Sequence, residues 1–167
     1  MLNMKITESI LAGIGGAIGI FLLSILTFSS DAPLLMAPFG ASCVLLFSVP
    51  ESPLSQPKNV IGGHLVSALV GVIFVYMWPV TPVTLALAVA LAITLMSLMK
   101  VTHPPAGADP IVILLGAKGF SFLLFPVLSG SILLVVVAFI FHRITSRHTY
   151  PSVKPNQPLQ TSNNTLA

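Results

Sequence analysis

Hydrophobic and polar positions divide the chain into long apolar stretches with short polar interruptions. Charge-free stretches cover residues 9–30, 59–99 and 119–142. A membrane helix needs about 20 residues to cross the hydrocarbon core, so the middle stretch is long enough for two crossings. The sequence "WPVTP" at 78–82 supplies a turn between them. The pattern therefore predicts four long membrane helices.

Two shorter apolar segments, at 32–50 and 104–117, each begin with proline and glycine. If both re-enter the membrane without crossing, the basic residues divide almost evenly between its two sides. If both cross, Lys118 alone lies opposite a group formed by Lys5, Lys58, Lys100, Arg143, Arg147 and Lys154. The second distribution is the one that the positive-inside rule favours. We therefore expect about six segments, four long and two short or broken, with both termini cytoplasmic.

Composition supports an integral membrane protein of the all-α class. Hydrophobic residues make up 55% of the chain and charged residues 7%, and the mean hydropathy is +1.01. Soluble domains contain about 25% charged residues. The net charge of +3 comes from basic residues that are scattered singly, which indicates topology signals and no nucleic-acid partner. The single cysteine, Cys43, excludes an internal disulfide. We expect a multi-pass protein of the cell inner (plasma) membrane.

The two short segments resemble each other. "PFGASCVLLF" from Pro38 and "PAGADPIVIL" from Pro105 share P-x-G-A, and the same offset places Gly63 on Gly130. Chance similarity between apolar segments is the alternative. An odd number of segments in each repeat would invert the second copy in the membrane, a recurring transporter design. We expect a membrane domain over 1–145, with repeats at about 9–79 and 83–142, and a disordered cytoplasmic tail over 146–167.

Three motifs occur in order along the chain: "APFGASCVLLF", "SPLSQPKNVIGGHLVSALVG" and "THPPAGADP". Together they resemble the HPP family of small integral membrane proteins, over roughly residues 10–142. The family is generally described as having four membrane helices, and the two short segments are where the counts differ. Its plant and cyanobacterial members are associated with nitrite transport. The resemblance therefore implies transport of a small inorganic anion, with nitrite as the first candidate.

The motif at 102–109 contains the candidate residues with the most chemistry. His103 could bind an anion or accept a proton, since histidine changes charge near neutral pH, or it could cap a helix. Pro104, Pro105 and Gly107 shape an irregular backbone that a ligand or neighbouring backbone can approach closely. Asp109 could relay protons, pair with a lysine or cap a helix, because a membrane carboxylate is rarely idle.

Other candidates lie in the first two motifs. Pro38, Gly40 and Ser42 are the repeat partners of Pro105, Gly107 and Asp109. In the second motif, Asn59, Gly63 and Ser67 share a helical face with His64 beside it, which suits either a polar path or close helix packing. Lys58 suits an anion funnel or a topology anchor equally. We expect Gly15 and Gly19 to pack helices and His142 to anchor at the membrane interface.

These expectations combine into a small membrane transporter or channel for a small inorganic anion. The candidate substrate-binding residues are His103, Pro104, Pro105, Gly107, Asp109, Pro38, Gly40, Ser42, Lys58, Asn59, His64 and Ser67. The alternative function is a non-transporting membrane subunit that packs against a partner protein. We expect no enzymatic activity, cofactor or metal, since no nucleophile with a base and no short metal-ligand spacing occurs. The expected partners are the lipid bilayer, the anion and further copies of the chain.

Overall fold

The computed structural model describes residues 2–29, 34–146 and 148–152, with the side chains of residues 2–5 left aside. In this part of the chain all regular structure is helical. The α-helices are α1 (Leu2–Ser29), α2 (Pro38–Ser48), α3 (Pro57–Met77), α4 (Pro82–Leu98), α5 (Asp109–Leu115) and α6 (Ser129–Thr145). Three short helical turns are η1 (Pro53–Ser55), η2 (Pro104–Ala108) and η3 (Leu123–Leu128). The all-α class and six helical segments expected from the sequence are confirmed.

Proline and threonine explain where several helices begin. Pro38, Pro57 and Pro82 each occupy the first turn of a helix, where a missing N–H costs no hydrogen bond. At the start of α4 the Thr81 hydroxyl accepts from the backbone N–H of Thr84, and the Thr84 hydroxyl accepts from the N–H of Thr81. This reciprocal cap confirms the turn expected in "WPVTP".

Two helices end in the same way, with a residue in the left-handed conformation. Lys100 after α4 has φ 55° and Ala117 after α5 has φ 46°. In each case the next residue donates its N–H to the carbonyl oxygen five residues back, from Val101 to Met96 and from Lys118 to Ile113. This is the Schellman pattern, which satisfies carbonyls left over at a helix end. The chain after α4 is thereby turned back into the bundle towards His103.

Helix length differs from the sequence expectation at one place. Three helical stretches, Ile6–Ser29, Pro57–Met77 and Leu123–Thr145, are long and apolar enough to cross a membrane. α4 has only 17 residues, because the left-handed turn at Lys100 ends it. The expected four long segments are thus three long helices and a shorter α4. α2 and the η2–α5 stretch are shorter still, as the proline-glycine openings indicated.

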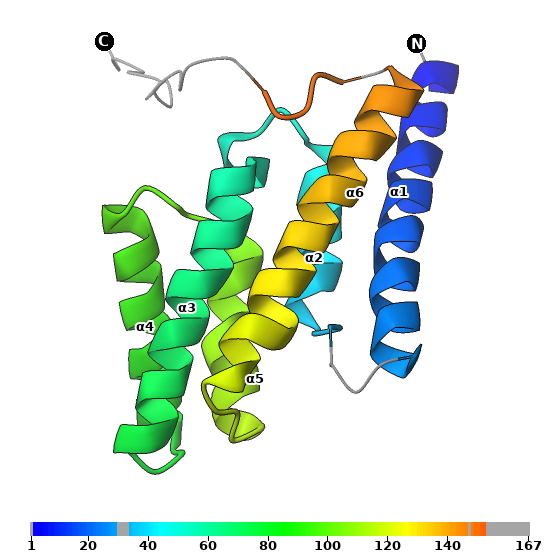
Figure 1. Ribbon diagram of the computed structural model, residues 1–167. Coiled ribbons are helices and arrows are strands. Elements are labelled where there is room, and N and C mark those ends of the chain that lie inside the picture. The colour runs from blue at the N-terminus through cyan, green and yellow to red at the C-terminus, as the bar shows by residue number, and fades with distance from the viewer. Residues whose placement is uncertain (1, 30–33, 147, 153–167) are drawn as a thin grey trace, which may run out of the picture.

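The helices alternate in direction along one bundle, and each short helix lies between long ones (Figure 1). α2 packs against α1 and α6, whereas α5 packs against α3 and α4. Gly15 and Gly19 bring α1 close to Phe47 on α2 and Leu134 on α6, which confirms their packing role. Large apolar side chains cover the outside of α1, including Ile10, which is 57% exposed. Such a surface suits lipid contact.

The chain after α6 packs back onto the bundle within its described residues. Tyr150 is 5% exposed, and its hydroxyl donates to the Ser55 carbonyl oxygen at 3.0 Å. The backbone N–H of Ser152 donates to the Gln56 side chain. Residues 148–152 therefore lie on the loop between α2 and α3. The rest of the expected disordered tail, residues 153–167, lies outside the described residues.

Candidate functional site

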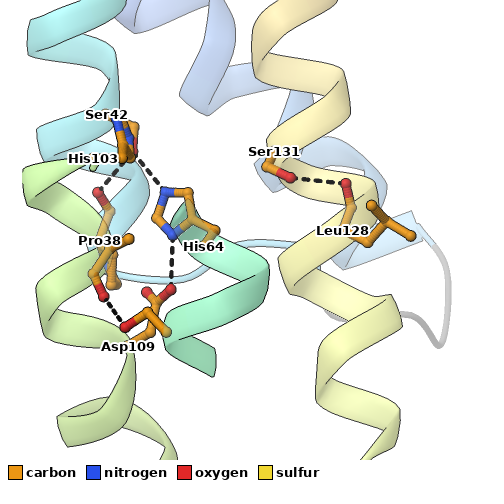
Figure 2. Close-up of polar contacts among 9 residues, drawn as sticks. Pro38, Ser42, His64, His103, Asp109, Leu128 and Ser131 are labelled. Carbon is orange, nitrogen blue, oxygen red and sulfur yellow. Dashed lines mark hydrogen bonds and ion pairs between the residues drawn. The ribbon is translucent and has the colours of Figure 1, made fainter. Parts of the chain in front are cut away.

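Four polar side chains that are distant in sequence meet inside the bundle. Ser42 lies on α2, His64 on α3, His103 just before η2, and Asp109 at the first residue of α5. All four are completely buried. Figure 2 shows them one above another between the helices, with Asp109 below His64 and with Ser42 and His103 above it.

Hydrogen bonds join the four side chains into one continuous chain, which we call the buried relay. Oδ2 of Asp109 lies 2.8 Å from Nδ1 of His64. Nε2 of His64 and Nε2 of His103 each lie 2.9 Å from Oγ of Ser42. Nδ1 of His103 lies 2.8 Å from the carbonyl oxygen of Leu54. Because a carbonyl oxygen can only accept, Nδ1 of His103 carries a hydrogen.

One face of α3 holds the segment before α5 in place. Asn59 donates its side-chain N–H to the Thr102 carbonyl at 2.9 Å, and the Ser67 hydroxyl donates to the Ala106 carbonyl at 2.6 Å. Gly63 lies between them, and a Cβ there would be 2.7 Å from the His103 Cβ and 2.8 Å from the Val101 carbonyl oxygen. The expected shared face is confirmed, and it combines polar contacts with close packing.

This face positions the relay without being part of it. A residue larger than glycine at position 63 would collide with the Cβ of His103 and with the Val101 carbonyl oxygen. On the other side, the ring of Phe39 meets His64 edge-on at a centroid distance of 5.2 Å. The imidazole of His64 is therefore fixed by an apolar neighbour as well as by its two hydrogen bonds.

The prolines and glycines of the two P-x-G-A motifs face outward or line a groove. Pro38, Pro104 and Pro105 line an apolar groove of about 630 Å³ between α2 and the η2–α5 stretch. Gly40 and Gly107 would meet nothing within 4 Å if they carried a Cβ. No neighbouring backbone approaches Gly107 within the described chain, and close approach of a ligand there stays a prediction. Gly40 faces the cavity between α1 and α2, whereas the small residues Ala41 and Ala108 line the groove.

Two further basic or titratable residues lie elsewhere. Lys58 is exposed at the start of α3, outside the relay. His142, expected as an interface anchor, is 2% exposed, and its Nε2 lies 2.8 Å from the Leu46 carbonyl oxygen. That expectation is wrong because α2 and the segment around Tyr150 enclose the ring, with the Tyr150 ring 5.7 Å away.

The sequence did not reveal two neighbours of the relay histidines. These are the Leu54 carbonyl oxygen, which accepts from His103, and the Phe39 ring, which packs against His64. Leu54 contributes only its carbonyl oxygen, and no sequence signal marks a backbone acceptor in a loop. Phe39 was part of the first motif, but an aromatic residue in an apolar segment is ordinarily core. Ser42, by contrast, was found through its alignment with Asp109 in the repeat.

The relay is linear, and its geometry differs from that of a metal centre. Its two histidines and one aspartate bond in series, with Ser42 between the imidazoles. Among the described residues, no group of three or more His, Cys, Asp or Glu side chains is arranged to hold a metal ion. The arrangement can hold protons and pass them between neighbouring side chains.

Comparison with known proteins places the chain in a family. Two curated transmembrane proteins of Dictyostelium discoideum are similar to it: one is 40% identical over 80% of this chain and 47% of its own length, and the other is 36% identical over 80% and 51%. The chain spans about half the length of these relatives. No solved structure matches it. The family model described as the HPP transmembrane region matches residues 1–151. A match of that extent, on a bundle of apolar helices built around the histidine of the HPP motif, makes the chain a member of the HPP family of transmembrane proteins.

Proposed function

We propose that this protein is a small membrane transporter for a small inorganic anion, with nitrite as the first substrate to test. The observation that carries the proposal is the buried relay of Ser42, His64, His103 and Asp109. A charged aspartate at the centre of a membrane helix costs roughly 2.5 to 3.5 kcal/mol on insertion scales, and ionisable residues within membrane segments are rare. Three of them in one hydrogen-bonded chain therefore indicate a role in moving charge or substrate. Nitrite is chosen on the family resemblance alone.

The packing of the two halves supports a transporter architecture. A Cβ at Gly63 would meet the Val101 carbonyl oxygen at 2.8 Å, and a Cβ at Gly130 would meet that of Leu34 at 2.8 Å. The repeat alignment pairs Gly63 with Gly130 and Leu34 with Val101. Exchanging the two halves therefore turns the contact between Gly63 and Val101 into the contact between Gly130 and Leu34. The helix pairs exchange in the same way: α2 packs on α6, and α5 packs on α3. Contacts that exchange in this way are what an inverted repeat produces.

The outer surface of the short helices supports an oligomer. α2 and η2–α5 are too short to cross about 30 Å of hydrocarbon, so their ends lie at membrane depth. Irregular backbone at that depth is tolerated where protein or a water-filled cavity covers it. A further copy of the chain over the apolar groove at Ala41 and Ala108 would provide such cover. The proposed protein is a transporter without enzymatic activity.

One observation favours the alternative of a non-transporting membrane subunit. All four relay side chains are completely buried, and their hydrogen bonds connect segments from four parts of the chain. A network of this kind also specifies a unique packing. Because the relatives are about twice as long, a partner domain could sit beside this bundle. In that case the relay would serve assembly.

Flux in reconstituted liposomes separates the two functions. The uptake of nitrite is compared with that of chloride, nitrate and formate for the wild-type protein, His103→Ala and the control His148→Ala. His148 lies at the end of the bundle and is about a third exposed, so its loss leaves the relay intact. A transporter shows anion-selective uptake that falls in His103→Ala and persists in His148→Ala.

The same preparations are examined by size-exclusion chromatography. If well-folded wild-type protein moves none of the four anions, the proposed substrate class is wrong. If His103→Ala also changes assembly while no flux is present, the subunit alternative is supported.

A further inference from the structure

The Ser42 hydroxyl has more neighbours than it can donate to. Its Oγ lies 2.9 Å from Nε2 of His64 and 2.9 Å from Nε2 of His103. A hydroxyl has one hydrogen to donate and lone pairs to accept with. The third neighbour of Oγ, the Pro38 carbonyl oxygen, is more distant at 3.4 Å. With the hydroxyl hydrogen directed to the closer ring nitrogens, one imidazole donates to Ser42 while the other accepts from it. The direction of every other bond in the relay follows from this choice.

The Leu54 carbonyl determines the direction at the His103 end. Nδ1 of His103 donates to this oxygen at 2.8 Å, so a neutral His103 accepts at Nε2. Ser42 then donates to His103, and His64 donates to Ser42 through Nε2. Nδ1 of a neutral His64 is left as an acceptor, so Oδ2 of Asp109 must supply the hydrogen. In this arrangement the carboxyl is protonated and all four side chains are neutral.

Two other arrangements contain the same number of hydrogens. Breaking the O–H bond of Asp109 and forming N–H at Nδ1 of His64 gives a carboxylate and an imidazolium. If the Nε2 proton of His64 then moves to Oγ of Ser42, and the original hydroxyl proton moves to Nε2 of His103, the positive charge shifts to His103. Ser42 now donates to His64. No proton is gained or lost, and every hydrogen bond keeps one hydrogen.

We propose that Ser42, His64, His103 and Asp109 form a proton relay that holds one mobile proton and couples anion movement to proton movement. Its physiological role rests on the proposed transport function, while the relay itself follows from the hydrogen bonds. Ser42 is the residue that connects the two imidazoles, whose ring centroids are 5.0 Å apart. Without its hydroxyl no hydrogen-bonded path joins His64 to His103 among the described side chains.

The two ends of the relay differ. Oδ1 of Asp109 is buried and has no hydrogen-bond partner in the described chain, so it can accept an incoming proton. The Leu54 carbonyl cannot pass a proton on, so exchange through Nδ1 of His103 requires that bond to open. The other titratable groups on the neighbouring elements do not bond to the relay. Lys58, Lys100 and Glu51 are exposed, and the Cys43 sulfur faces Gly19 of α1.

Nitrogen NMR of the protein in bilayers, with isotope-labelled histidine, tests the relay independently of transport. The expected result is His103 carrying its hydrogen on Nδ1 and His64 on Nε2, or one of the two rings doubly protonated. Two neutral rings that both carry hydrogen on Nδ1 would leave the Ser42 hydroxyl between two acceptors, with no ring proton to pass through it, and would overturn the proposal. This readout needs no substrate, so it remains decisive even if the liposome experiment finds no anion flux.

Coupling is tested by nitrite uptake into liposomes with and without a pH gradient, in the wild-type protein, Ser42→Ala, Ser42→Thr and Ser131→Ala. Ser131 is a matched control: it is also completely buried on a helix, but its hydroxyl bonds only locally to the Leu128 carbonyl at 3.0 Å (Figure 2). The expected stimulation by the gradient falls to none in Ser42→Ala and persists in Ser42→Thr and Ser131→Ala.

The outcomes separate the two proposals. Flux in the wild type that keeps its gradient dependence in Ser42→Ala contradicts the relay and leaves anion transport standing. Absence of flux in the wild type, together with the expected histidine hydrogens, contradicts the anion substrate and leaves the relay standing. If Ser42→Ala fails to fold, Asp109→Asn takes its place, since an amide can donate to His64 but cannot deliver a proton.

Discussion

At the scale of single residues, the site is governed by the cost of an unpaired polar atom. A buried donor or acceptor without a partner costs about 1 to 3 kcal/mol. The relay avoids this cost at His64 and His103, because each ring nitrogen has a partner. Oδ1 of Asp109 is the exception, and it lies at the end where a proton would enter. A neutral carboxyl tolerates this position better than a carboxylate would.

Substitutions of Asp109 test whether its carboxyl is protonated. In Asp109→Ala, Nδ1 of His64 loses its partner, and we expect a loss of stability of about 1 to 3 kcal/mol. In Asp109→Asn, the amide N–H replaces the carboxyl O–H, so the unfolding temperature in detergent should stay close to that of the wild type. Thermal unfolding of both variants checks this. Equal destabilisation by the two substitutions would indicate an ionised aspartate.

Glycine substitutions test how tightly His103 is held. Gly63→Ala places a methyl group 2.7 Å from the His103 Cβ, and we expect a cost of about 1 to 3 kcal/mol for overpacking. Gly40→Ala is the matched control, since a Cβ there meets nothing within 4 Å. Alanine in a helix interior is favoured by about 0.5 to 1 kcal/mol over glycine, so this control should unfold at the same or a higher temperature. A Gly63→Ala protein as stable as Gly40→Ala would contradict the packing.

How far the sequence predicts the site differs from residue to residue. His103, His64 and Asp109 stand out because polar groups are rare in this apolar chain, and Ser42 follows from its alignment with Asp109. The sequence does not say that these four bond in series, because their partners come from separate helices. The sequence also does not say whether Gly107 contacts a neighbouring backbone, since a glycine that leaves open space and one that permits close contact look the same in sequence.

At the scale of the helices, apolar length predicts most segments but not their ends. The turn at 78–81 follows from proline and threonine, and it is present. The shortening of α4 depends on Lys100 in the left-handed conformation, which few sequence rules would assign to lysine. The contact of residues 148–152 with the loop between α2 and α3 was also missed, because a polar segment gives no sign of a docking site.

The docked segment leads to a prediction about pH. Burial raises the pKa of Tyr150 above its ordinary value. An unfolded tyrosine loses its proton near pH ~10, before the folded one does, so docking should weaken as the pH rises above that value. Ultraviolet titration of Tyr76→Phe protein observes Tyr150 as the remaining tyrosine. Its ionisation should occur at higher pH in the folded protein than after denaturation, and identical titrations would contradict the docking.

At the scale of the whole molecule, the distribution of basic residues between the two ends of the bundle agrees with the alternating direction of the helices. Lys58, Lys100 and Arg143 lie at the end of the bundle where the chain begins, and Lys118 lies in the loop after α5 at the other end (Figure 1). This is the asymmetry expected for six segments. The family description of four helices agrees with this asymmetry only if α2 and the η2–α5 stretch also carry the chain across, as short segments that the description leaves out.

Cysteine labelling decides between six segments and a re-entrant topology. In a Cys43→Ala background, single cysteines replace Lys100, Lys118 or Glu51, all of which are exposed. Because the η2–α5 stretch carries the chain from one end of the bundle to the other, a membrane-impermeant maleimide should label Lys100→Cys and Glu51→Cys from one side and Lys118→Cys from the opposite side. The positive-inside rule assigns the first side to the cytoplasm. Labelling of Lys100→Cys and Lys118→Cys from the same side would show that the stretch re-enters without crossing. His103 would then be reached from that side alone, and the relay could not form part of a path across the membrane.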